Sequence, residues 1–118
     1  MCRESIFRIK GVSGACYEFD EYPLKTSLAD TLKILGNAPG VYIFLSSTAD
    51  ASGCEQRNQL YCGITADIIG SMGEMFLSGI VRRADFLCFA YEPSPLVRCD
   101  LWADILLANS FIYNESQN

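Results

Sequence analysis

Two tyrosines in two short apolar runs are the residues of this chain whose types and spacing could do chemistry. Residues 40–44 read Gly-Val-Tyr-Ile-Phe and residues 60–65 read Leu-Tyr-Cys-Gly-Ile-Thr, so that Tyr42 and Tyr61 each lie within a predicted strand. The chain contains no histidine, which excludes a histidine metal site, a histidine general base and a Cys-His dyad. Because a strand tyrosine is more often a β-favouring residue packed on a sheet, the surrounding pattern must decide between packing and function.

Taken together, the two runs resemble the GIY-YIG motif that names a superfamily of nucleases. The order of predicted elements between residues 39 and 114 is also similar to the GIY-YIG fold. Upstream, residues 14–24 are similar to an N-terminal hairpin of a bacterial branch of small stand-alone GIY-YIG proteins. The resemblance implies that Tyr42 and Tyr61 line an active site, where one of them would help to activate the attacking water.

Two residues that the resemblance implies for the following helix are replaced. The family pattern Tyr-x-Gly-x-Thr matches Tyr61, Gly63 and Thr65, and it places Ser71 where the family carries an arginine. Four residues later, Met75 stands where the family carries a histidine. Side chains that would stabilise negative charge on a phosphate are therefore missing from both positions.

The position implied for the metal-binding glutamate is changed as well. In the family this glutamate precedes an asparagine that ends a Tyr-Asn or Cys-Asn pair, and counting back twelve residues from Asn114 gives Trp102. Cleavage of a phosphodiester by this route needs a cation that polarises the phosphoryl oxygens, and an indole cannot bind one. We expect Trp102 to be substantially buried and to fill the cleft that would otherwise hold metal and phosphate.

Neighbouring carboxylates are not expected to rescue the metal site. Asp100 and Asp104 lie two residues on either side of Trp102, about 200° around a helix, so they should point away from the site that Trp102 faces. Glu74, in the preceding predicted helix, could reach the rim of the site.

The sequence therefore predicts a catalytically inactive GIY-YIG-like domain, with no metal and no cofactor, that serves as a protein-interaction or structural module. Its vestigial site comprises six residues, none of them expected to be catalytic: Tyr42, Tyr61, Gly63, Ser71, Met75 and Trp102. Binding is expected at Tyr42, Tyr61, Trp102 and Asn114. One alternative is a divergent metal-dependent nuclease that acts on nucleic acid through Tyr42, Tyr61 and Glu74. The other alternative is a small-molecule pocket in the former cleft, lined by Tyr42, Tyr61, Met75 and Trp102.

Length and charge restrict the partners of this domain. With 118 residues, half of them apolar, the chain fits a single domain over residues 1–118. A formal net charge of −5, from 9 basic and 14 acidic residues, makes nucleic-acid binding weak or absent and favours a protein partner, itself or another chain. No signal peptide and no apolar stretch of bilayer length is recognisable, so we expect a cytoplasmic protein that does not enter membranes.

The apolar pattern predicts an α+β sandwich, in which a small central antiparallel sheet is flanked by helices. An N-terminal hairpin is expected over residues 5–22 and the core of the domain over residues 39–114. Strands are predicted at residues 41–45, 59–64 and 85–91. The last of these is apolar on both faces, which indicates a strand that is covered on both sides.

The intervening segments predict three helices and one long loop. Helices are expected to begin at Thr26 or Ser27, at Thr65 or Asp67, and at Leu96. The segment over residues 46–58, rich in Ser, Ala and Gly, predicts a loop. Six cysteines without CxxC spacing predict reduced thiols, three of which should be buried in strands: Cys16, Cys62 and Cys88.

The amount of apolar sequence also predicts self-association. Residues 85–91 have no polar side, and residues 96–109 form a helix that is apolar on more than one face. A domain of this size has a limited interior, so we expect an exposed apolar patch, distinct from the old cleft, that supports a two-fold homodimer.

Overall fold

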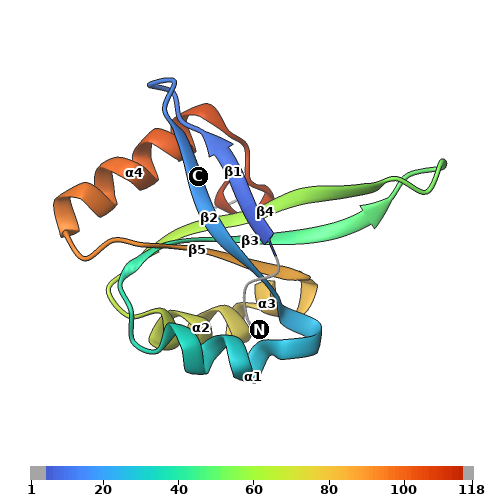
Figure 1. The fold of residues 1–118 in the computed structure, drawn as a ribbon, viewed down its shortest axis with the longest axis horizontal. Helices are drawn as coiled ribbons and strands as arrows, with labels where there is room; N and C mark the ends of the chain where they lie inside the picture. The colour runs from blue at the N-terminus through green and yellow to red at the C-terminus, as the bar shows by residue number, and fades with distance from the viewer. Residues whose placement is uncertain (1–4, 116–118) are drawn as a thin grey trace.

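The chain folds into one five-stranded antiparallel sheet with helices on both faces, as Figure 1 shows. The computed structural model describes residues 5–115, without the side chains of residues 26–28 and 115. The predicted α+β class, a small antiparallel sheet between helices, is confirmed. In chain order the elements are β1 (Ser5–Lys10), β2 (Cys16–Pro23), α1 (Leu24–Leu35), β3 (Gly40–Ala49), β4 (Glu55–Thr65), α2 (Ile68–Ser78), α3 (Ile80–Arg83), β5 (Phe86–Tyr91), α4 (Pro95–Ala108) and α5 (Ile112–Glu115).

The last strand in the sequence, β5, lies at the centre of the sheet. The strand order is β1-β2-β5-β3-β4, so β5 pairs with β2 on one side and with β3 on the other. The hairpins β1–β2 and β3–β4 therefore share no main-chain ladder and are joined through β5. This position explains why the strand is apolar on both faces, since helices cover the sheet from both sides.

The alternation of side chains along β3 separates two apolar cores. Tyr42 and Phe44 point to the face that α1, α2 and α3 cover, which we call the three-helix face. Val41, Ile43 and Leu45 point to the opposite face, which α4 covers and which we call the α4 face. All five side chains are buried, so neither face of β3 is left to solvent at these positions.

Helix α2 begins where the sequence predicts, because Asp67 caps it. The Asp67 carboxylate accepts a hydrogen bond from Gly70 N, and the Asp67 N–H donates to Thr65 Oγ1 at 2.9 Å. The helix ends before Gly79, whose φ of 87° lies in the left-handed region that glycine tolerates. Helix α1 instead begins at Leu24, ahead of Thr26 and Ser27. Within residues 5–115, no helix combines the length and apolar character that a membrane crossing requires.

Residues 46–58 form a two-stranded ribbon, which corrects the predicted loop. Strands β3 and β4 stay paired out to Ala49 and Glu55, and the ribbon, which we call the arm, projects beyond the rest of the sheet in Figure 1. The connecting turn is closed by the Asp50 carboxylate, which accepts hydrogen bonds from the N–H groups of Ser52 and Cys54 at 2.9 Å each. The segment is polar because residues 48–56 of the arm are exposed to solvent, and its composition therefore resembles that of a loop.

Two of the three strand cysteines are buried as predicted. Cys62 and Cys88 have no exposed surface, and burial raises the pKa of both thiols. Cys16 is exposed, which corrects its predicted burial, because it opens β2 next to the turn from β1. These three cysteines are free, as are Cys54 and Cys99.

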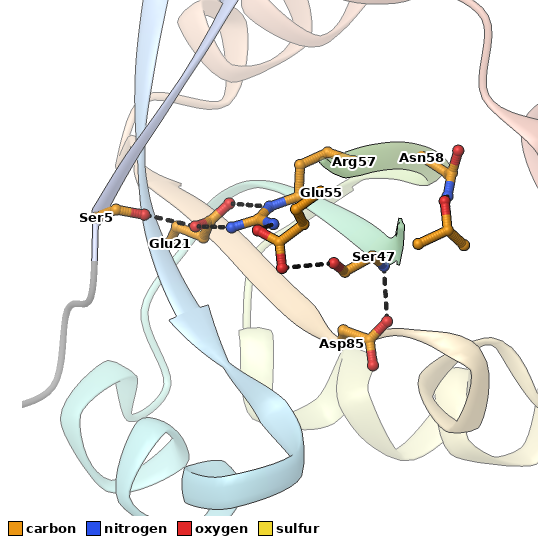
Figure 2. A network of polar contacts seen from close by, with 8 residues as sticks. Ser5, Glu21, Ser47, Glu55, Arg57, Asn58 and Asp85 are labelled. Atoms are coloured by element: carbon orange, nitrogen blue, oxygen red, sulfur yellow. Dashed lines mark hydrogen bonds and ion pairs between the residues drawn. The ribbon is translucent and has the colours of Figure 1, made fainter. Parts of the chain in front are cut away.

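A buried ion pair ties the two hairpins together across β5 (Figure 2). Glu21 of β2 is 3% exposed, and Arg57 of β4 donates to its carboxylate from Nε at 3.3 Å and from Nη2 at 3.2 Å. Ser5 Oγ donates to the same carboxylate at 2.5 Å. The Arg57 guanidinium lies 3.9 Å from the ring centre of Phe86 in β5. The pair thus passes over the central strand, and neither charge is buried without a partner.

The same network continues to the base of the arm. Arg57 also donates to the Glu55 carboxylate, and Ser47 Oγ donates to Glu55 at 2.8 Å. Ser47 N donates to the Asp85 carboxylate at 2.7 Å. Lys25 Nζ lies 3.0 Å from Asp85 Oδ1. These contacts connect the base of the arm to Asp85, which directly precedes β5.

We expect Arg57→Met to lower the free energy of unfolding by about 3 kcal/mol, because it leaves the Glu21 carboxylate buried without a cation. The control Arg8→Met removes only an exposed ion pair with Glu18 and should cost less than about 1 kcal/mol. Urea unfolding followed by circular dichroism measures both values. An equal loss in the two variants would contradict a structural role for the buried pair.

Candidate functional site

The two motif tyrosines lie side by side on the three-helix face. The ring centroids of Tyr42 and Tyr61 are 6.0 Å apart, and their planes are inclined by 39°. Tyr42 is 3% exposed, whereas Tyr61, on the neighbouring strand, is partly exposed. The Tyr42 ring crosses over Gly63, where any Cβ would collide with the phenol. Packing alone therefore requires glycine at this point of β4.

Helix α2 brings a hydroxyl group to the tyrosines. Ser71 Oγ lies 2.6 Å from Thr65 Oγ1, and this side chain also lowers the pKa of Tyr42. Met75, one turn further along α2, packs against the same apolar core. The structure thus brings together five of the residues that the sequence singles out: Tyr42, Tyr61, Gly63, Ser71 and Met75.

The electrostatics of this cluster do not favour catalysis by Tyr42. Burial raises the pKa of Tyr42 well above its ordinary value of 10.0, and the neighbouring Tyr61 raises it further. Glu74 is exposed, and its negative charge also raises the Tyr42 pKa, but less than Tyr61 does. A phenol in this state keeps its proton at neutral pH and cannot serve as a general base. Among residues 5–115, no group of three or more His, Cys, Asp or Glu side chains is placed to hold a metal.

Trp102 lies apart from this cluster, which corrects the expectation that it fills a cleft between the tyrosines. Its side chain is partly buried in the core of the α4 face, on the other side of the sheet from Tyr42 and Tyr61. The reason is the placement of α4, which covers the face opposite α2 (Figure 1). Tyr42, Tyr61, Met75 and Trp102 therefore do not line one common pocket.

Trp102 and Asn114 instead cap the main chain of Cys62 at the outer edge of β4. Asn114 Oδ1 accepts a hydrogen bond from Cys62 N at 2.7 Å, and Asn114 Nδ2 donates to Cys62 O at 3.0 Å. Trp102 Nε1 donates to the same carbonyl oxygen at 3.1 Å. Side chains thus satisfy the polar groups of an edge strand where another strand could otherwise pair.

A second polar cluster, which the sequence does not predict, centres on Asp104 of α4. Its carboxylate accepts hydrogen bonds from Ser13 N at 2.9 Å, from Ser13 Oγ at 2.7 Å and from Tyr17 Oη at 2.6 Å. These bonds hold the β1–β2 turn onto α4. Beside them lies an open cavity of about 470 Å³, whose lining includes Tyr17, Glu92, Val97, Asp100, Leu101 and Asp104. No local signal predicts this cluster, because Ser13 and Asp104 are 91 residues apart.

No protein-family model, no curated protein and no solved structure matches the chain. The resemblance to the GIY-YIG superfamily remains a prediction that rests on the motif residues around Tyr42 and Tyr61.

Removal of the edge cap should destabilise the protein. We expect Asn114→Ala to lower the free energy of unfolding by about 2 kcal/mol, because it leaves the N–H group of Cys62 without its partner. The control Asn58→Ala removes bonds to Ser46 and Thr48 on the open arm and should cost less than about 0.5 kcal/mol. Thermal and urea unfolding measure the loss of stability in both variants. Equal losses in Asn114→Ala and Asn58→Ala would contradict a stabilising role for the cap.

The Asp104 cluster should be visible in a titration. Hydrogen bonds from Tyr17 and Ser13 hold the pKa of Asp104 below its ordinary value of 3.8, and the bond from Tyr17 has the larger effect. A lowered folded-state pKa contributes stability above about pH 4, which is lost as the pH falls through the folded-state pKa. We expect Tyr17→Phe to move the Asp104 pKa upward in an NMR titration, and Tyr91→Phe, at an exposed tyrosine, to leave it unchanged. An unmoved pKa in Tyr17→Phe would contradict the assignment.

Proposed function

We propose that the chain is a catalytically inactive GIY-YIG-like domain that serves as a protein-interaction or structural module. The state of Tyr42 is the observation that carries this proposal. Its side chain is 3% exposed, and the side chains that act most strongly on its pKa are Tyr61, Ser71, Cys62 and Glu74, none of which is basic.

This state is unsuited to cleaving a phosphodiester. A tyrosine that assists such a reaction must reach a water and a phosphate, and a positive group must stabilise the charge that develops. The side chain of Tyr42 is closed off from solvent, and Ser71, at the position matched to the family's arginine, carries a hydroxyl that is already bonded to Thr65. The site retains the packing that the motif residues provide and lacks the groups that the reaction requires.

The surface of α2 supports a protein as the partner. Three large apolar side chains of this helix are exposed, Ile69 at 40%, Phe76 at 42% and Leu77 at 92%. Glu74 is the single charged residue in the helix sequence. An exposed apolar surface of this kind suits a protein partner, whereas a nucleic acid would require basic side chains.

The two alternatives receive less support from the geometry. A divergent nuclease would have to bind its metal through Glu74, a single exposed carboxylate near the tyrosines. A small-molecule site in the former cleft would have to form without Trp102, which lies on the α4 face.

The purified chain should leave plasmid, linear duplex and single-stranded nucleic acid intact in Mg²⁺ or Mn²⁺, as gel electrophoresis would show. The double variant Ser71→Arg with Trp102→Glu should stay inactive as well, because the new carboxylate would lie on the other side of the sheet from Tyr42. Cleavage by the wild type that disappears in Tyr42→Phe would sink the proposal, whereas cleavage that survives in Tyr42→Phe identifies a contaminant. Tight, salt-sensitive binding of duplex DNA at physiological ionic strength would also contradict it.

A further inference from the structure

The outer edge of β4 presents main-chain groups that point away from the sheet. Ser47 N donates to the Asp85 carboxylate, so the main chain of β3 at this residue faces away from β4. In an antiparallel pair, the main-chain N–H and C=O groups of two directly opposite residues either point toward each other or both point away from the partner strand. Arg57 is opposite Ser47, and Glu55 is opposite Ala49, two residues further along. The N–H and C=O groups of Arg57 and Glu55 therefore point outward from the edge.

The chain covers only the inner half of this edge. Asn114 and Trp102 cap Cys62, and Gln59 Nε2 donates to Ser110 O at 2.9 Å, so the segment leading into α5 lies along β4 up to this point. Closer to the tip of the arm, residues 5–115 provide no hydrogen-bond partner for the outward main-chain groups of Glu55 and Arg57. The unpaired groups are thus confined to a short stretch of one strand.

The charges on this stretch complement those of a second, antiparallel copy of the same strand. Glu55 and Arg57 carry opposite charges two residues apart, and so lie on the same face of the arm, where they contact each other. Charges of one sign would repel a second copy of the strand and so protect the edge. With opposite signs, an antiparallel copy whose two-fold axis passes through Gln56 places Glu55 of each chain opposite Arg57 of the other. An axis through Arg57 would instead place like charges opposite each other.

We propose that the chain forms a two-fold dimer in which the β4 edge of the arm pairs with the same edge of a second copy. Glu55 and Arg57 of each chain exchange main-chain hydrogen bonds with Arg57 and Glu55 of the other, and the two sheets become continuous. This inference deepens the proposed function, because it names a second copy of this chain as a partner. The two can fail separately, since cleavage of nucleic acid would end the proposed function and leave the dimer untouched.

Sedimentation equilibrium of the full chain tests the association. The wild type should show a monomer–dimer equilibrium, and Glu55→Arg should weaken it at least about tenfold, because it sets like charges opposite each other at two positions. Glu18→Arg is the matched control, since it makes the same change of charge and also removes an exposed ion pair, but far from β4. A single species at the 13.1 kDa monomer mass would overturn the proposal, as would a dimer that Glu18→Arg and Glu55→Arg weaken equally.

Cross-linking tests the register independently of charge. Gln56 would face its own copy across the axis with a Cα–Cα distance of about 4.5 Å, which a disulfide can span. In a background with Cys2, Cys16, Cys54 and Cys99 replaced by serine, Gln56→Cys should form a dimer under mild oxidation. Thr48→Cys should not form this disulfide. Thr48 is opposite Gln56 within the chain but lies one strand further from the axis, so about 14 Å would separate the Cα atoms of residue 48 in the two copies. Equal cross-linking of both variants, or of neither, would overturn this register.

Discussion

The central position of β5 is the constraint on which the rest of the structure depends. The two hairpins form from neighbouring segments, but they become one sheet only when a strand encoded after both of them inserts between them. That strand is covered from both sides, so its residues must be apolar on both faces and cannot carry a functional group into the middle of the sheet. Charged side chains that interact across the sheet therefore lie on other strands. The Glu21–Arg57 pair, which bridges β2 and β4 above Phe86, is the clearest result, because it reinforces a junction in which no main-chain ladder joins the two hairpins directly.

Packing accounts for the motif residues without catalysis. A Cβ on Gly63 would collide with Tyr42, and a Cβ on Gly40 would collide with the carbonyl of Ala90 and approach the ring of Phe89. Each glycine is therefore required by the close approach of another part of the core. In the same way, the hydroxyl of Ser71 is engaged inside the domain, where it lies 2.6 Å from Thr65 Oγ1. A sequence that preserved only the stability of this fold would keep these glycines and this tyrosine, so their presence is no evidence of an active nuclease.

The two ends of β4 show how differently one edge strand is treated. At its inner end, the indole of Trp102 and the amide of Asn114 satisfy the main chain of Cys62, so that α4 and α5 close the sheet there. The arm projects beyond the rest of the sheet, and its residues 48–56 are exposed. Its polar composition keeps it compatible with water, while its outward main-chain groups remain available for another strand. The function of Trp102 in the fold is therefore to close an edge, and a separate part of the same strand is left open.

Features that depend on the local pattern of residues can be predicted from the sequence. The alternation around Tyr42 and Tyr61, the two-sided apolar run of β5 and the cap at Asp67 all concern neighbouring residues, and their predictions are confirmed. The prediction of a loop at the arm was wrong, because a solvent-exposed two-stranded ribbon and a loop have similar polar compositions.

Contacts between residues far apart in the chain depend on how the elements pack together. Glu21 and Arg57 are 36 residues apart and Tyr17 and Asp104 are 87 residues apart, so no local spacing connects either pair. The side of the sheet that Trp102 occupies depends on where α4 packs, which counting along the sequence cannot supply. Local propensity determines the elements, whereas the faces they bury and the partners they find are set when the whole sheet closes around β5.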